Sequence, residues 1–191
     1  MKTKMAVMLA GCCLVMGEAQ AFSVSYDQKI TKGRQVIDGK MAVKDDLFRM
    51  EAIIEGQRTV TIRNREGTYT VMPDQGIAMK IGVLPPSQEP VQGGNEYLGD
   101  LRQRGATLVG SETVNGYACD MYRYTDPQTG ETTVWVWKEK QFPVKIVMNG
   151  LDGQSTVELS NIRLNASIPD ADFQLPPGVQ VMDMGSMMQM Q

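Results

Sequence analysis

The chain has 191 residues, with 19 lysines and arginines against 22 aspartates and glutamates, a formal net charge of −3, and no histidine. The lack of histidine excludes Ser-His-Asp and Cys-His catalysis, HExxH metalloproteases and the common imidazole metal sites. We therefore expect a protein that is not an enzyme and that holds no metal or cofactor. A mildly acidic chain without a basic cluster also argues against nucleic acid as a partner.

The N-terminal residues have the pattern of a secretory signal peptide. Lysines open the chain, an apolar run follows at residues 5–16, and Ala19-Gln20-Ala21 offers the small residues of a cleavage site. An apolar run of twelve residues is too short to span a bilayer as a stable helix. We predict a signal peptide over residues 1–21 and a mature protein in the periplasm. The alternative is a lipid anchor on Cys12, because Leu9-Ala10-Gly11-Cys12 resembles a bacterial lipobox.

Six short runs of alternating apolar and polar residues follow, separated by turn residues such as Asp45-Asp46 and Gly56. Alternation at short, regular spacing predicts antiparallel strands in a meander, each with one face toward a core. The expected strands cover residues 22–32, 40–44, 48–54, 60–62, 69–71 and 77–81.

The pattern then changes to a proline-rich loop and a short helix. Prolines and glycines between residues 85 and 94 prevent regular structure. Asn95 is a suitable N-cap for a helix over residues 96–104, which Gly105 would end. Its apolar stripe is formed by Tyr97, Leu98 and Leu101. We expect this helix to be either a plug that seals the core or a mobile lid.

The stretch 110–148 contains three strands joined by tight hairpins. Asn115-Gly116 favours positive φ at both central positions of a two-residue turn. Residues 126–130 supply the proline and glycine of the next turn. In the middle strand, Val134 and Val136 point one way, while Thr133, Trp135 and Trp137 point the other. Both faces are therefore apolar at the centre, and one of them could border a second apolar space.

The last part of the chain has a strand with a phase shift and then a tail. Asn161 shifts the apolar alternation, which indicates a β-bulge. We expect the β domain to cover residues 22–180 and the methionine-rich residues 181–191 to form a flexible tail. The tail could dock on an apolar surface. Its thioethers could instead bind Cu(I), through Met182, Met184, Met187, Met188 and Met190.

Several stretches together resemble the LolA-like superfamily of bacterial envelope proteins, and more closely an uncharacterised branch with a methionine-rich tail. The stretches are GKMAVKDDLFRME (39–51), REGTY (65–69), SETVNGYACDMYRY (111–124), VWVWKEKQFPVK (134–145), ELSNIRLN (158–165) and DFQLPPG (172–178). The resemblance implies a mainly β fold, a curved antiparallel sheet that forms an unclosed half-barrel, with a helical lid on its concave side. In the carriers of this superfamily, the concavity holds acyl chains.

The sequence and the resemblance together give one leading hypothesis, a non-enzymatic envelope protein that binds a lipid, an acyl chain or a lipidated partner in an apolar concavity. The expected lining residues are Phe48, Met50, Ile54, Met79, Trp135 and Trp137, and the expected lid residues are Tyr97, Leu98 and Leu101. The alternative is an envelope protein–protein interaction module whose core is filled by its own side chains. Cu(I) binding by the tail is a minor alternative.

Overall fold

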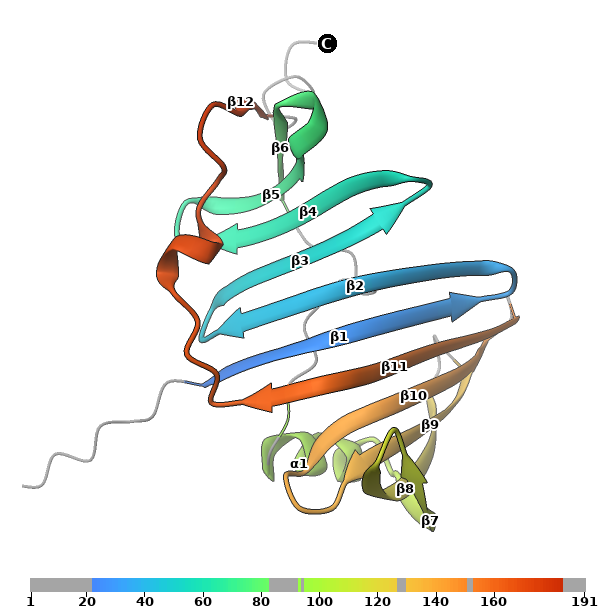
Figure 1. Ribbon diagram of the computed structural model, residues 1–191. Coiled ribbons are helices and arrows are strands. Elements are labelled where there is room, and N and C mark those ends of the chain that lie inside the picture. Colours follow the sequence, from blue (N-terminus) through green and yellow to red (C-terminus); the bar gives the residue numbers. More distant parts are fainter. Residues whose placement is uncertain (1–21, 83–92, 94, 127–129, 151–152, 184–191) are drawn as a thin grey trace, which may run out of the picture.

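The chain forms one twelve-stranded sheet in a computed structural model (Figure 1). The structure describes residues 22–82, 93, 95–126, 130–150 and 153–183. The strands in chain order are β1 (Ser23–Lys32), β2 (Gln35–Lys44), β3 (Leu47–Ile54), β4 (Gln57–Asn64), β5 (Gly67–Met72), β6 (Ile77–Ile81), β7 (Thr107–Val114), β8 (Tyr117–Asp126), β9 (Gly130–Trp137), β10 (Phe142–Gly150), β11 (Gly153–Leu164) and β12 (Gln180–Asp183). The helical elements are α1 (Asn95–Gln103) and the 3₁₀ turns η1 (Pro73–Gln75) and η3 (Asp170–Phe173).

Two meanders meet in the middle of this sheet. The strand order is β12-β6-β5-β4-β3-β2-β1-β11-β10-β9-β8-β7, so the first strand pairs with the eleventh and joins the two halves. Every pairing is antiparallel except that of β12 with β6, and the sheet ends at β12 and β7 without closing. The mainly β, unclosed half-barrel expected of a LolA-like fold is therefore confirmed.

The local turn and bulge predictions are also confirmed. Asn115 and Gly116 have φ values of 51° and 84°, the two positive values that a type I′ hairpin requires, and they join β7 to β8. Asn161 has φ 52° and lies where the register between β1 and β11 shifts by one residue. Asparagine tolerates this left-handed conformation better than most residues, so the bulge forms at that position.

The predicted helix is present one residue earlier than expected at each end. It ends where Gly105 adopts a φ of 74°, and the Ala106 N–H donates to the Leu101 carbonyl at 2.9 Å. The proline-rich residues 83–92 and the predicted signal peptide lie outside the described residues. Within the described ranges, no helix has the length and apolar character needed to cross a membrane.

The structure extends the sheet beyond the expected end of the domain. Val181 and Met182, assigned by the sequence to a flexible tail, belong to β12 and pair in parallel with Ala78 and Met79 of β6. The preceding segment brings them there, because Phe173 is fully buried and the Gln180 N–H donates to the Gly76 carbonyl at 2.8 Å. A strand of four residues is too short to show an alternation of apolar and polar side chains in the sequence. The strand β12 is therefore recognised only by its pairing with β6.

The register gives the middle strands β1, β2 and β3 two faces of opposite character. On one face, Tyr26, Met41 and Met50 are direct cross-strand partners, and we call this side the apolar face. On the other face, Asp27, Lys40 and Glu51 are direct partners, and we call it the charged face. Successive side chains of a strand point to opposite faces, so one set of strands supplies both surfaces.

Candidate binding site

The residues expected to line a cavity lie, in part, in a packed core on the apolar face. Phe48 is 0% exposed and Met50 is 6% exposed. They belong to a cluster of buried side chains that contains Val24, Tyr26, Met41, Val43, Phe48, Met50, Ala52, Phe142 and Leu159. A crevice beside Met50 leaves no room for a water molecule. The centre of the apolar face is therefore filled by the protein's own side chains.

Two further expected lining residues lie at the margins of this face. Ile54 is half-buried and packs against the same cluster as Phe48. Met79 is also half-buried. It lies in the same cross-strand row as Met50, with Thr61 and Thr70 between them, so it points to the same face. The apolar face thus continues from β1 to β6 with decreasing burial.

The predicted lid residues pack over the other half of the sheet. Leu101 is 3% exposed and forms a cluster with Val134 and Val136 of β9, against which Tyr97 and Leu98 also pack. Burial raises the pKa of the Tyr97 hydroxyl, as expected for a ring shielded from water. The cluster around Leu101 shares no residue with the cluster around Phe48. In this structure α1 thus packs on β9 and its neighbours.

Trp135 lies on the face opposite to Phe48 and Met50. It lies directly opposite Lys145 of β10, and Lys145 lies directly opposite Glu158 of β11. Glu158 in turn lies directly opposite Lys29 of β1, which is on the charged face. Directly opposed residues in antiparallel strands point to the same side. The Lys145 ammonium lies 5.3 Å from the centre of the Trp135 ring, in the range of a cation–π contact.

Trp137 shares the side of Trp135, because it follows two residues later on the same strand. Its ring centre lies 4.8 Å from that of Tyr117. The Trp135 indole Nε1 donates to Glu112 Oε2 at 2.9 Å, which satisfies a donor that would otherwise be buried unpaired. The two tryptophans therefore form a small core with Val114, Cys119 and Val144, separate from the one around Phe48.

The methionines proposed to bind Cu(I) lie, apart from Met182, outside the described residues. Within the ranges that the structure describes, no group of three or more histidine, cysteine, aspartate or glutamate side chains could hold a metal ion. The copper hypothesis stays a prediction.

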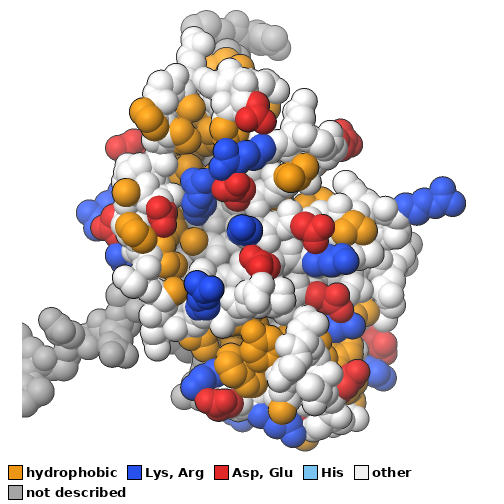
Figure 2. All heavy atoms as spheres, viewed as in Figure 1, with side chains coloured by type: hydrophobic (Ala, Val, Ile, Leu, Met, Phe, Trp, Pro, Cys, Tyr) orange, Lys and Arg blue, Asp and Glu red, His pale blue; other side chains and the backbone are white. Residues whose placement is uncertain are grey.

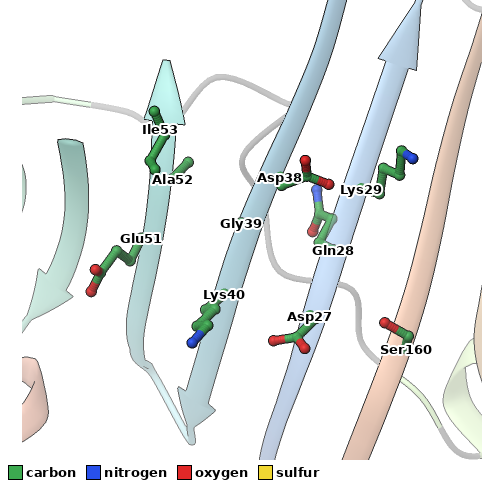
Figure 3. Close-up of a pocket in the computed structure, with 10 residues that line it drawn as sticks. All are labelled: Asp27, Gln28, Lys29, Asp38, Gly39, Lys40, Glu51, Ala52, Ile53 and Ser160. Atoms are coloured by element: carbon green, nitrogen blue, oxygen red, sulfur yellow. The ribbon is translucent and has the colours of Figure 1, made fainter. Parts of the chain in front are cut away.

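A trough of about 550 Å³ lies on the charged face, across four neighbouring strands (Figure 3). Ser160, Asp27, Lys40 and Glu51 are direct partners from β11 to β3 and form one side of it. Lys29, its partner Asp38, and Ile53 form the other side. The backbone of Gln28, Gly39 and Ala52 runs between the two rows. Figure 2 shows side chains of both charges mixed over the middle of this face.

A second hollow of about 610 Å³ adjoins the trough. Lys40 and Glu51 line both, and the far wall of the second hollow comes from residues 171–177, which include most of η3 and the segment after it. This wall is fixed to the sheet, because the Arg49 guanidinium donates to the Asp172 carbonyl at 3.4 Å and Asn64 donates to the Phe173 carbonyl at 3.2 Å. The two hollows together form a groove, which we call the charged groove.

Ion pairs fix the charge of the groove wall. Glu51 accepts from Arg58 Nε at 2.8 Å and from Arg49 at 3.2 Å. The hydrogen bond from Arg58 is the main cause that lowers the pKa of the Glu51 carboxyl, against the opposing effect of burial. Lys29, Asp38 and Lys40 make no ion pair with any other residue in the described ranges and are exposed. The groove therefore presents charged groups that are available to a ligand.

The sequence places Lys40 and Glu51 on the polar side of their strands, and none of the charged residues of the groove was predicted to be a binding residue. Alternation shows that Lys40 and Glu51 point away from the core. It does not show that β1, β2, β3 and β11 are neighbours, because that depends on the pairing of β1 with a strand about 130 residues later. The chemistry available at the groove is ionic and hydrogen-bonding recognition.

Comparisons with known proteins concern mainly the fold. A family model described as a domain of unknown function, DUF4412, matches residues 25–141. A comparison with proteins of curated function found no match.

Three solved structures illustrate the fold likeness. An uncharacterized conserved protein from Thermus thermophilus matches with a TM-score of 0.62 and 10% identity, over 84% of this chain and 90% of that one. The MucA/MucB complex from Pseudomonas aeruginosa matches with a TM-score of 0.55 and 15% identity, over 85% of this chain and 59% of the matched chain. The LolA superfamily protein NE2245 from Nitrosomonas europaea matches with a TM-score of 0.38 and 12% identity, over 83% and 92%.

Proposed function

The chain belongs to the DUF4412 family, and from that premise we propose that it is a non-enzymatic binding protein of the bacterial envelope whose ligand is another protein. This is the alternative that the sequence left open beside lipid binding. The envelope location rests on the predicted signal peptide. The absence of catalysis rests on the lack of histidine.

The observation that carries the proposal is the filled centre of the apolar face. An acyl chain needs a continuous apolar space, since each CH₂ left in water costs about 0.8 kcal/mol. Phe48 and Val24 are 0% exposed, so neither borders a space that a water molecule could enter. Two open spaces large enough for a ligand lie on the charged face, and charged side chains are part of the lining of both.

The fold likeness gives independent support. The MucA/MucB structure is a complex of two proteins, and one of its chains shares this fold at a TM-score of 0.55. A protein that contains a sheet of this architecture therefore occurs in a protein complex. At 15% identity the likeness transfers no residue and no partner to this chain.

The test is crosslinking in cells that express the full chain with its N-terminal 21 residues intact, combined with native mass spectrometry of the purified protein. We expect a stoichiometric crosslink to another polypeptide and a native mass equal to that of the mature chain alone. A native mass that includes a lipid, with no protein crosslink, would contradict the proposal.

Acyl-chain binding on the apolar face is a second candidate, and one observation favours it. Ile37, Ile54 and Ile81 are half-buried around the core cluster, and α1 packs over a different part of the sheet. A chain could enter there only if these side chains separated from their neighbours. Protection of the protein against thermal unfolding by added fatty acid would support this candidate.

A further inference from the structure

We propose that the open edge of β7 takes up an extended segment of the protein partner as an added strand, with an aromatic side chain of that segment lying over Gly110. The inference rests on the proposed function, because it assumes that the ligand is a polypeptide. It adds the docking surface, the backbone conformation of the bound segment and one residue type that the segment must contain.

The strand β7 ends the sheet on one side, at the lower end in Figure 1. In the described part of the chain it pairs with β8 alone. Every residue of β7 except Val114 is exposed. Six large apolar side chains of the described residues are exposed, and two of them, Leu108 at 60% and Val109 at 45%, belong to this strand. The edge is therefore accessible and partly apolar.

Only part of β7 carries the usual protection of an edge strand. Sheet edges are commonly guarded against further pairing by lysine, proline, a bulge or a covering element. This strand contains no lysine, arginine or proline. Its one carboxylate, that of Glu112, accepts the Trp135 indole N–H and is thus directed over the sheet. A bulge between Leu108 and Gly110 distorts the first half, which leaves residues 110–114 as a regular edge.

The hairpin between β7 and β8 decides which backbone groups of this edge face outward. The residues that flank its two-residue turn, Val114 and Tyr117, form a hydrogen-bonded pair. Hydrogen-bonded and non-hydrogen-bonded pairs alternate along an antiparallel ladder. The N–H and carbonyl groups of Ser111 and Thr113 therefore point away from β8, toward the open side.

The hydrogen bonds of β8 agree with this assignment. Ala118 lies directly opposite Thr113, and its carbonyl accepts from the Lys138 N–H on the side of β9 at 2.9 Å. The backbone of Ala118 thus points away from β7, and that of its partner Thr113 points away from β8. Outward-facing donors and acceptors at alternate residues are the groups with which an added strand pairs.

Gly110 offers the added strand a specific side-chain contact. It lies directly opposite Met121, which lies directly opposite Trp135. A Cβ placed on Gly110 would come 3.7 Å from the Met121 sulfur, so a side chain that covers Gly110 contacts this half-buried thioether. Thioethers make favourable contacts with aromatic rings, and an aromatic residue beside an edge glycine replaces the packing that the glycine lacks. We therefore expect an aromatic residue at this position of the segment.

This requirement distinguishes a partner segment from the chain itself. A second copy would offer its open edges, β7 and β12, and neither strand contains an aromatic residue. The residues of this chain that lie outside the described ranges contain no phenylalanine, tyrosine or tryptophan either. The aromatic side chain over Gly110 must therefore come from another polypeptide.

The test selects displayed random dodecapeptides that bind the chain from residue 22 to 191, and discards those that also bind Thr113→Pro. A proline at this position removes an N–H that faces outward, so it blocks the added strand and leaves the pairing of β7 with β8 in place. We expect the remaining peptides to share an aromatic residue. Fluorescence anisotropy with a selected peptide should show a loss of affinity of about tenfold or more for Thr113→Pro. A smaller loss is expected for Gly110→Val, which fills the space over Met121.

A matched control makes the same change at the other edge of the sheet. The Gln180 N–H donates to the Gly76 carbonyl on the side of β6, so the N–H of the next residue, Val181, faces outward. We expect Val181→Pro to bind the peptide as tightly as the unmodified chain does. Circular dichroism and the urea midpoint check that all three variants are folded.

Peptides with single N-methylated amides separate strand addition from other ways of docking. Only every second amide of an added strand faces β7. We therefore expect N-methylation to weaken binding at alternate positions of the selected peptide and to be tolerated between them. Losses without this alternation would overturn the inference.

Two further results would overturn it. One is equal affinity of Thr113→Pro and Val181→Pro for the selected peptides. The other is a dimer in sedimentation velocity that Thr113→Pro dissociates, because a second copy would then occupy the edge. The proposed function is judged separately, since a crosslinked partner that persists in cells with Thr113→Pro would leave protein recognition in place and remove only the edge of β7.

Discussion

The two faces of β3 show how the same strand builds a core and a charged surface. Phe48 and Ile53 are both large apolar side chains, but Phe48 is 0% exposed and Ile53 is 65% exposed. They differ by an odd number of positions, so they point to opposite sides of the sheet. The comparison teaches that side-chain type does not identify the core in this protein. The core is identified instead by the face to which a residue points and by the strands that flank it.

The largest expected effect compares these two residues directly. Phe48→Ala should lower the free energy of unfolding by about 3–5 kcal/mol, because it leaves a cavity in a packed cluster. Ile53→Ala should change it by less than about 0.5 kcal/mol, since its side chain is mostly in water. Urea unfolding at neutral pH measures both. Similar values for the two variants would show that the apolar face is not packed as described.

The next prediction tests whether α1 is a plug. Leu101→Ala should cost about 2–5 kcal/mol, because Leu101 is 3% exposed against Val134 and Val136. Leu108→Ala, on the exposed edge strand, is the matched control and should be nearly neutral. A mobile lid would instead give a small cost for Leu101→Ala, with rapid amide exchange throughout the helix.

A smaller effect is expected at the second core, on the other side of β9. Glu112→Ala removes the acceptor of the Trp135 indole N–H and should cost about 1 kcal/mol. Glu112→Gln keeps an acceptor oxygen and should restore most of that loss. A double-mutant cycle with Trp135→Phe isolates the contact, and a coupling energy near zero would mean that the hydrogen bond does not contribute.

The smallest expected effect concerns the ion pairs of the charged face. The lowered pKa of Glu51 means that its pairing stabilises the folded state above the ordinary pKa of a glutamate. That contribution is lost as the pH falls through the lowered folded-state value. Arg58→Gln should therefore be slightly less stable than the unmodified chain at neutral pH, and the two should converge in acid. The difference should also shrink with added salt. A difference that grows on acidification would contradict this assignment.

Much of the fold follows from local chemistry that the sequence displays. Turn residues such as Asn115-Gly116 and the phase shift at Asn161 act within a few residues, and both predictions are confirmed. The helix at residues 95–103 follows in the same way from its cap and its apolar stripe. The unclosed sheet, expected from the LolA-like resemblance, is confirmed as well.

The arrangement of the candidate site depends on distant pairings that no local pattern shows. The alternation of side chains along the strand places Trp135 and Val134 on opposite faces of the sheet. Only the cross-strand partners Lys145 and Glu158 show that the tryptophan is on the charged side. The strand β12 is similarly defined by β6 and not by its own residues. The two ends of the charged groove were missed because Ser160 of β11 and the segment 171–177 are far in the sequence from the strands beside which they lie.

The most direct test of the closed apolar face is photolabelling of the purified chain with a diazirine fatty acid, followed by peptide mapping. Trypsin cleavage after Arg49 and Arg58 releases residues 50–58, which carry Met50 and Ala52 of the core cluster. We predict no saturable label on this peptide, because its apolar side chains leave no space for an acyl chain. Saturable labelling of Met50 or Ala52 would show that the face opens to lipid and would contradict the account.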